Sequence, residues 1–179
     1  MSEKLSDVEK RAALIIKYRG MRVKEKMDEG DLITYTLSKE GKEYVMQCVL
    51  NQRTVGVSFV RNLRDMVEKT EAEGGILLAD VKYTYSARAN APKLGVELIP
   101  PSLPTFDFFK HTLVPRATLV SEEERQELLE KFHAEPYQFP WIKKSDPVSI
   151  VLGATPGDII RFISDSLTAG ASETYRYVI

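Results

Sequence analysis

The sequence has little of what covalent or metal chemistry usually requires. Its 179 residues include one cysteine and two histidines. A single cysteine excludes a disulfide bond within the chain. This residue, Cys48, lies in the apolar run YVMQCVL. The run predicts a buried thiol in a reducing compartment and leaves a reactive thiol as the less favoured alternative.

An excess of charge of either sign is also missing. The formal net charge is -1 and the pI is about 6.2. These values argue against a protein that coats nucleic acid by bulk charge, although a local basic patch could still contact phosphates. No run approaches the roughly 20 apolar residues that span a bilayer, and the segment MSEKLSDVEKR is not typical of a secretory leader. We therefore expect a soluble, intracellular protein without membrane contacts.

The first hundred residues carry helix and hairpin signals. Hydrophobic residues make up 43% of the chain, which is enough for the core of one large domain or two small ones. Ser6 and Glu9 predict a capping box at the start of a helix that Gly20 ends. The runs DLITYTLS and KEYVMQCVL predict a hairpin that turns at residues 39–41.

The following segment changes to a helical period. Apolar residues recur at helix spacing in VGVSFVRNLRDMVEKTEAEGG, at Val57, Val60, Leu63 and Val67. The pair GG at 74–75 is expected to stop this helix. The strand GILLA, a short helix over residues 86–91 and the strand GVELI follow. This order predicts an α/β domain over residues 1–100.

A proline-rich run, PPSLP, marks the domain boundary. Prolines lack a backbone donor and stiffen the chain in an extended conformation. We therefore expect a linker over residues 101–110 and a second, α+β domain over residues 111–179.

Capping residues define the helices of this second domain. The segment TLVP is expected to be extended. Ser121 and Glu124 predict a capping box for the helix that follows, and Pro136 is expected to close that helix. Further on, Asp146 can cap a short helix with Pro147 at its first position, and Gly153 should stop it.

The end of the chain is predicted to form a strand pair. ATPGD fits a type II turn, with Pro156 at its second position and Gly157 at its third, where a positive φ is needed. The strands DIIRFIS and ETYRYVI follow and are joined by DSLTAGAS. Tyr175 and Tyr177 alternate with Arg176, so one face of the last strand can be buried while the other is left for solvent or a partner.

The second half contains no catalytic constellation. His111 and His133 lack the spacing of metal ligands, and no cysteine lies in this half. The run SEEERQE is typical of a solvated helix face. We expect no catalytic group, cofactor or metal in this domain.

Four motifs of the second half occur together in one known family. HTLVPR, LVSEEERQELLEKF, SDPVSIVLGATPGDIIRF and SLTAGASETYRYVI, in that order, resemble a conserved domain that a small archaeal RNA polymerase subunit shares with the fifth subunit of eukaryotic nuclear RNA polymerases. The resemblance implies a non-catalytic subunit that docks on the largest polymerase subunit near downstream DNA. GATPGDII and SLTAG favour the archaeal form, which implies a cytoplasmic location; a eukaryotic host would imply the nucleus.

Several positions match this family's pattern residue by residue. They are His111, Pro115, Asp146, Pro147, Gly153, Pro156, Gly157, Thr168, Ala169, Gly170 and Arg176. The resemblance implies structural or docking roles for them, mostly through turns and caps. The sequence departs from the pattern at Asp165, where a basic residue is usual, and at Ala117, where many members carry histidine.

The first half resembles a different family. EGDLI, YVMQCVLN, VGVSFVRNLRDMVEK and GGILLADVKYTYSARANAPKLGVELI together resemble the restriction-endonuclease fold, in particular its Mrr-like branch. That family binds a divalent cation through an Asp and a Glu or Gln, here Asp31 and Gln47, and activates water with a lysine two residues later. Val49 occupies the lysine position. The resemblance implies an inactive jaw domain, because valine cannot stabilise developing negative charge; Asp31 as a turn residue and Gln47 as a strand residue are the alternative interpretations.

Three functions therefore stay open. The first is a structural subunit of DNA-directed RNA polymerase, with the largest and other polymerase subunits as partners and no activity of its own. The second is a metal-dependent nuclease with an interaction domain, and the third is a DNA-binding regulator that borrows a polymerase-docking domain. The basic stretch KYRGMRVKEK could contact downstream DNA phosphates without sequence preference, or form an ordinary solvated face.

Overall fold

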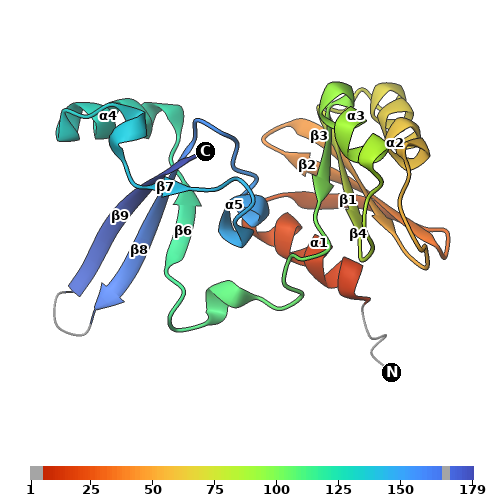
Figure 1. Ribbon diagram of the computed structural model, residues 1–179, viewed down its shortest axis with the longest axis horizontal. Coiled ribbons are helices and arrows are strands. Elements are labelled where there is room, and N and C mark those ends of the chain that lie inside the picture. Colours follow the sequence, from red (N-terminus) through yellow and green to blue (C-terminus); the bar gives the residue numbers. More distant parts are fainter. Residues whose placement is uncertain (1–5, 167–169) are drawn as a thin grey trace. The chain divides into compact units, whose positions relative to one another are not determined.

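The chain forms two compact units, Met1–Phe106 and Asp107–Ile179. A computed structural model describes residues 6–166 and 170–179 (Figure 1). Each unit has its own sheet. The α/β character of the first unit and the mixed α and β character of the second confirm the predicted fold class.

The first unit is built on a five-stranded mixed sheet. Its strands lie in chain order: β1 (Arg22–Asp28), β2 (Leu32–Lys39), β3 (Lys42–Val49), β4 (Gly74–Ala79) and β5 (Val96–Ile99). β1, β2 and β3 pair antiparallel, whereas β3, β4 and β5 pair parallel. The predicted hairpin is confirmed, and its turn is closed by Glu40 and Gly41 at positive φ values of 52° and 82°.

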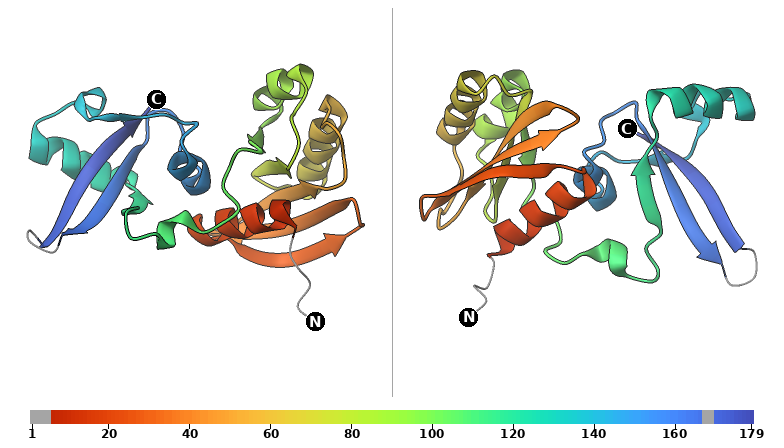
Figure 2. Two further views of the ribbon diagram at one scale, coloured as in Figure 1. Left: turned by 60° about the horizontal axis from the view of Figure 1, so that its bottom comes forward. Right: turned by 180° about the vertical axis from the view of Figure 1, so that it is seen from behind.

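Helices cover both faces of this sheet (Figure 2). α1 (Asp7–Tyr18) lies on one side, and α2 (Val57–Lys69) and α3 (Tyr85–Asn90) lie on the other. α2 buries Val60, Leu63 and Val67 against the strand residues Val45 and Val49. The alternate strand residues, such as Met46 and Cys48, point to the opposite face. A sheet buried on both faces explains the nearly continuous apolar run in β3.

The predicted helix starts are confirmed, but one predicted stop is wrong. Ser6 Oγ accepts the Glu9 N–H at 3.2 Å, and the Glu9 carboxylate accepts the Ser6 N–H at 3.0 Å. α2 ends at Lys69, five residues before the glycine pair, and Gly74 and Gly75 begin β4 instead. A Cβ at Gly75 would lie 2.9 Å from Leu63 Cγ, so this glycine permits close packing of α2 on the sheet.

The run PPSLP is not extended, contrary to expectation. The Leu103 N–H donates to Pro100 O at 3.1 Å, which makes a turn. Leu103 is 2% exposed, and its carbonyl accepts the Arg11 Nε–H at 2.7 Å. Burial of Leu103 therefore holds this segment on the first unit.

The second unit is built on a four-stranded sheet in the order β6-β8-β9-β7. The strands are β6 (Arg116–Leu119), β8 (Ile159–Ser166), β9 (Gly170–Val178) and β7 (Trp141–Ile142). β7 pairs parallel to β9, and the other pairs are antiparallel. Two further helices are α4 (Glu122–Phe132) and α5 (Pro147–Leu152), and short 3-10 turns cover Phe108–Lys110 and Pro136–Gln138.

The two helices of this unit lie on opposite faces of its sheet. Phe132 of α4 packs edge-to-face on Tyr175, with 6.0 Å between the ring centroids. A carboxylate oxygen of Glu124 lies 3.3 Å from a guanidinium nitrogen of Arg161. Arg161 and Tyr175 are cross-strand partners, so they share the face that α4 covers. α5 lies against the other face, on which Phe162 and Thr174 are partners.

Most turn predictions for the second unit are confirmed. Ser121 and Glu124 form the capping box of α4, and Gly153 ends α5 with a φ of 74°. Gly157 has a φ of 105°, and the Asp158 N–H donates to Thr155 O at 3.0 Å, as a type II turn requires. α4 ends at Phe132, and its C-cap residue His133 has a left-handed conformation, so the helix stops before the expected Pro136.

The segment TLVP is not extended, so this prediction is wrong. The Val114 N–H donates to His111 O at 3.0 Å, so this segment is a turn, and the strand begins only at Arg116. β1, β6 and β7 were not predicted. Every residue of β1 is exposed, so its sequence has no apolar alternation to reveal a strand.

Candidate functional site

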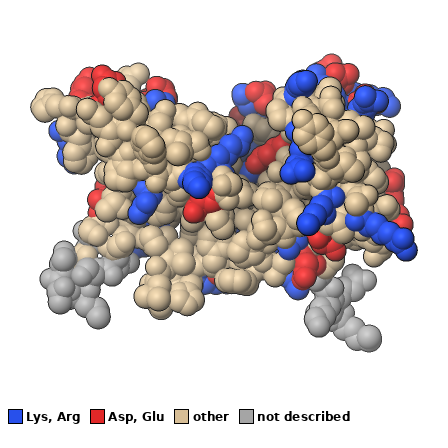
Figure 3. Space-filling view, viewed as in Figure 1, with Lys and Arg blue, Asp and Glu red and all other residues tan. Residues whose placement is uncertain are grey.

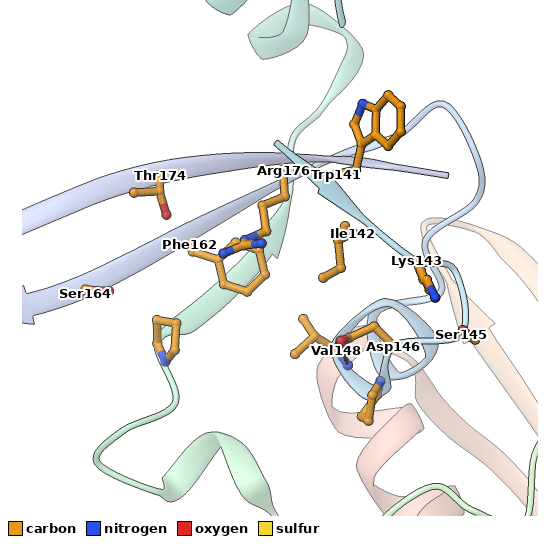
Figure 4. Close-up of a pocket in the computed structure, with 12 residues that line it drawn as sticks. Trp141, Ile142, Lys143, Ser145, Asp146, Val148, Phe162, Ser164, Thr174 and Arg176 are labelled. Atoms are coloured by element: carbon orange, nitrogen blue, oxygen red, sulfur yellow. Dashed lines mark hydrogen bonds between the residues drawn. The ribbon is translucent and has the colours of Figure 1, made fainter. Parts of the chain in front are cut away.

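A groove opens on the second unit between α5 and the sheet (Figure 4). It has a volume of about 750 Å³. Phe162, Ser164, Thr174 and Arg176 form its floor on β8 and β9. The start of α5 forms one wall, with Asp146, Pro147 and Val148; Pro115, Trp141, Ile142, Lys143 and Ser145 complete the lining.

The α5 wall is positioned by local backbone chemistry. Asp146 Oδ1 accepts the Val148 N–H at 2.9 Å, which satisfies an otherwise free donor at the helix start. Pro147 occupies the first helical turn, where no amide donor is needed. The backbone of Lys144 donates to Ile179 O at 2.8 Å and so ties this wall to the end of the chain. The wall is therefore largely preformed.

Arg176 is the principal charged group of the floor. Its guanidinium lies over the Phe162 ring, 5.8 Å from the ring centroid (Figure 4). The Arg176 side chain is exposed, and no ion pair joins it to a carboxylate in the part of the chain that the structure describes. Thr174 and Ser164 offer hydroxyls on the same face. The floor can thus bind an anionic or hydrogen-bonding group.

The opposite face of β9 is closed by aromatic packing. Three rings, those of Phe132, Phe139 and Tyr175, contact one another edge-to-face, with 6.0–6.2 Å between their centroids. Burial raises the pKa of Tyr175, and its hydroxyl donates to Glu173. The predicted alternation of the last strand therefore holds at Tyr175 and Arg176, but it fails at Val178, which is buried on the Arg176 face.

The structure brings together part of the predicted set of motif residues. Pro115, Asp146, Pro147 and Arg176 line the groove. Outside it lie His111, Gly153, Pro156, Gly157 and Gly170, of which the glycines have positive φ. Thr168 and Ala169 lie outside the described residues.

Sequence reasoning missed several groove residues, namely Trp141, Lys143, Phe162 and Thr174. Trp141 lies at the groove with 61% of its surface exposed, and its indole N–H donates to Tyr137 O at 3.0 Å. A single exposed tryptophan before the Asp146 cap is a signal that could have drawn attention to this segment. Phe162 and Thr174 could not be paired without knowledge of the strand register.

In the first unit, the positions predicted from the nuclease resemblance lie at the β2–β3 hairpin. Asp31 is exposed, and its carboxylate accepts the Asn51 side-chain N–H at 2.8 Å. Gln47 is 2% exposed, and its amide nitrogen contacts Thr34 Oγ1 at 3.5 Å and Met66 Sδ at 3.8 Å.

Val49 is 1% exposed in an apolar cluster with Val55 and Val60. Among residues 6–166 and 170–179, no three His, Cys, Asp or Glu side chains are grouped so that they could hold a metal ion. The apolar residues packed around Val49 cannot replace the amine of a lysine.

Internal ion pairs occupy most of the basic stretch at residues 17–26. Arg19 forms a two-pronged pair with Glu97 at 2.6 and 2.7 Å, and its side chain is 7% exposed. Lys24 pairs with Glu43, and Lys26 pairs with Glu9 at 3.1 Å. On the face shown in Figure 3, basic and acidic side chains are interspersed within each unit. These pairs favour the interpretation of this stretch as a structural and solvated face.

The other reactive side chains have structural surroundings. Cys48 is fully buried, as expected, and burial raises the pKa of its thiol to about 12. His133 caps α4, while His111 Nδ1 accepts the Leu113 N–H at 3.2 Å. Within the described ranges, no helix is both long and apolar enough to cross a membrane.

Two families match the chain, one for each unit. The family described as RNA polymerase Rpb5, C-terminal domain, matches residues 106–178. The family described as Restriction endonuclease matches residues 3–101. The two resemblances seen in the sequence motifs are thereby confirmed.

Curated relatives resemble the second unit. DNA-directed RNA polymerase subunit Rpo5 of Pyrococcus abyssi is 51% identical over 74 residues, which are 41% of this chain and 90% of that protein. The subunit Rpo5 of Thermococcus kodakarensis is 47% identical over 74 residues, again 41% of this chain and 90% of that protein. For Sulfolobus acidocaldarius the identity is 45% over 73 residues, 41% of this chain and 87% of the relative.

A solved structure titled as a protein of unknown function also resembles part of the chain. It has a TM-score of 0.41 and 15% identity, and the match covers 55% of this chain and 59% of that one.

Proposed function

Because this chain belongs to the RNA polymerase Rpb5 C-terminal domain family through residues 106–178 and to the restriction endonuclease family through residues 3–101, we propose that it is a subunit of DNA-directed RNA polymerase. The second unit docks on the largest polymerase subunit. The first unit is a jaw that does not cleave DNA and lies near the downstream duplex.

The extent of the match to the curated relatives carries this proposal. Some 90% of the Pyrococcus abyssi subunit aligns with this chain at 51% identity, so the likeness covers most of that subunit and not an isolated motif. The groove adds a physical basis for docking, since a preformed concave surface with an exposed tryptophan and an arginine is typical of protein interfaces. The named relatives are archaeal, which favours an archaeal host and a cytoplasmic polymerase.

The surroundings of three residues support a non-catalytic first unit. Hydrolysis in this fold requires metal ligands and an amine that stabilises the transition state. Val49 lies in an apolar cluster, Gln47 is buried against Thr34 and Met66, and the Asp31 carboxylate is held by Asn51. The unit supplies a scaffold without the reactive amine.

A metal-dependent nuclease is the second candidate, because the restriction endonuclease family matches residues 3–101 and Asp31 and Gln47 are retained. Purified full-length protein incubated with supercoiled plasmid and Mg²⁺ or Mn²⁺ separates the two candidates. We expect the plasmid to stay intact. Nicking that EDTA abolishes would instead establish the nuclease.

Contact with DNA is a separate question. A free-standing regulator would bind duplex DNA with a steep dependence on salt, because each neutralised phosphate releases counterions. We expect weak binding by the isolated chain, since its formal net charge is -1. A submicromolar dissociation constant that rises steeply with added salt would favour the regulator.

Affinity purification tests the polymerase proposal directly. The chain is tagged in its host and purified after nuclease treatment, which removes partners tethered through DNA, and the co-purified proteins are identified by mass spectrometry. We expect the largest polymerase subunit at a stoichiometric level. Recovery of the chain without any polymerase subunit would overturn the proposal.

A further inference from the structure

The groove of the second unit has a net positive lining with little internal neutralisation. Lys143 and Arg176 are its cations and Asp146 is its single acid, so two positive charges and one negative charge leave +1. Asp146 already accepts the Val148 N–H. Neither Lys143 nor Arg176 forms an ion pair with a carboxylate in the segments that the structure describes. The groove therefore has positive charge that can pair with an anionic ligand.

Arg176 is presented in a way that suits a carboxylate. Its guanidinium lies 5.8 Å from the Phe162 ring centroid, and stacking on an aromatic face leaves the N–H edges of the fork free. A fork of this kind binds a carboxylate through two parallel hydrogen bonds. The ring beneath also limits the side-chain motion that binding would otherwise have to freeze.

Apolar side chains make up much of the remaining lining of the groove. Pro115, Ile142 and Val148 line it together with Phe162, and the volume of about 750 Å³ falls within the range of about 300–1,000 Å³ typical of ligand pockets. A ligand must therefore fill apolar space beside the charge. The hydroxyls of Ser164 and Thr174 can bond a peptide backbone at the floor.

We propose that this groove binds an extended acidic segment of a partner polymerase subunit, with an Asp or Glu on Arg176 and a neighbouring large apolar side chain against Phe162 and Ile142. The proposal rests on the proposed function and names the chemistry of its docking. A nucleic-acid strand fits less well, because binding to phosphates generally requires several cations and this lining carries a net charge of only +1.

The first experiment compares two charge reversals in the full-length chain. Arg176→Glu changes the groove, while Lys131→Glu makes the same change on α4, which covers the opposite face of the sheet. Polymerase is purified from cells that carry each tagged variant, and the amount of incorporated subunit is measured. We expect Arg176→Glu to reduce incorporation about 10- to 100-fold, the usual effect of losing hydrogen bonds to a charged group. Lys131→Glu should be incorporated like the wild type, and circular dichroism melts should show that both variants fold.

A second experiment identifies the ligand chemistry. Overlapping peptides of about 15 residues that tile the largest polymerase subunit are titrated against the wild type, with the fluorescence of Trp141 at the groove as the signal. We expect the best tile to carry an acid close to a large apolar residue. Arg176→Lys should bind it with intermediate affinity, because a lysine keeps the charge but loses the planar fork. Replacing the acid of the tile by lysine should weaken binding to the wild type and restore binding to Arg176→Glu.

The results separate failure of this inference from failure of the proposed function. If the wild type joins polymerase and Arg176→Glu joins it equally well, the groove inference is overturned and the polymerase proposal stands. Preference for a neutral tile, or for a single-stranded DNA oligonucleotide over every tile, would also overturn it. Absence of the wild type from polymerase would defeat the proposed function itself.

Discussion

The two units of this protein differ in how many large side chains they bury in a core. Of the twelve largest fully buried side chains among the described residues, ten lie in the first unit, and Ile159 and Ile160 lie in the second. Helices lie on both faces of each sheet, but the second unit leaves a groove open beside α5. Their ranges of 106 and 73 residues contribute to this difference, because a smaller domain buries a smaller share of its surface.

The two units also differ in the surroundings of their candidate functional residues. In the first unit, Val49 is part of the core and packs in one cluster with Val60. In the second, polar and aromatic groups such as Arg176 and Trp141 stay at the surface. A small unit with a thin core gains stability when a partner binds its folded form.

The largest effect is expected from introducing a charge into the first core. Val49→Lys places an amine at a site that is 1% exposed and surrounded by valines. We expect a loss of about 3–5 kcal/mol in the free energy of unfolding, measured by urea denaturation, because an unpaired buried charge is not compensated. Val49→Met is the control for length and should cost much less; equal losses for the two variants would show that crowding, not charge, decides.

A second test is whether the two units unfold independently. Ile160→Ala and Leu77→Ala each remove a side chain that is fully buried, one in each unit, and each should cost about 2–5 kcal/mol. Trp141 is the single tryptophan and belongs to the second unit, so its fluorescence reports that unit. We expect Ile160→Ala to lower the denaturation midpoint seen by Trp141 and Leu77→Ala to leave it unchanged. Equal shifts would mean that the units unfold as one.

Smaller effects should distinguish structural from exposed cations in the basic stretch. Arg19→Ala removes a guanidinium that is 7% exposed and doubly bonded to Glu97, so we expect a loss of about 1.5–3 kcal/mol in thermal or chemical unfolding. Lys24→Ala breaks the exposed pair with Glu43 and should cost at most about 1 kcal/mol. Equal losses in the free energy of unfolding for the two variants would show that burial of the Arg19 ion pair adds nothing to stability.

The smallest effect concerns pH. Burial raises the pKa of Cys48 from its ordinary value of 9.0 to about 12 and also raises the pKa of Tyr83. The unfolded thiol releases its proton first as pH rises above about 9, so the folded state binds more protons and stability falls. At pH 10 we expect a loss of about 1 kcal/mol from Cys48. Cys48→Val should flatten this decline in urea titrations between about pH 8 and pH 10.5, and an unchanged slope would contradict the assignment.

Local signals predicted much of the fold. The capping boxes at Ser6 and Ser121, the cap at Asp146 and the turn at Gly157 are all present, because each depends on a hydrogen bond or a φ value set within a few residues. The strands β1, β6 and β7 escaped prediction, since they are short or exposed and their pairing partners lie elsewhere in the chain.

The candidate site was predicted less completely. Pro115, Asp146, Pro147 and Arg176 were recognised as motif residues, but nothing local indicated that they line one groove. The residues that complete it, Phe162 among them, enter through the pairing of β8 with β9 and the packing of α5.

The amino-acid order by itself determined the helix starts, the tight turns and the two family resemblances, since these depend on side chains acting on their own backbone or on motifs read in sequence. Tertiary structure alone decided that Val49 lies in a core, that Arg19 pairs with Glu97, and that Arg176 faces an open groove over Phe162. Those outcomes depend on strand register and helix packing, which join residues far apart in the chain and which no local hydrogen bond can specify.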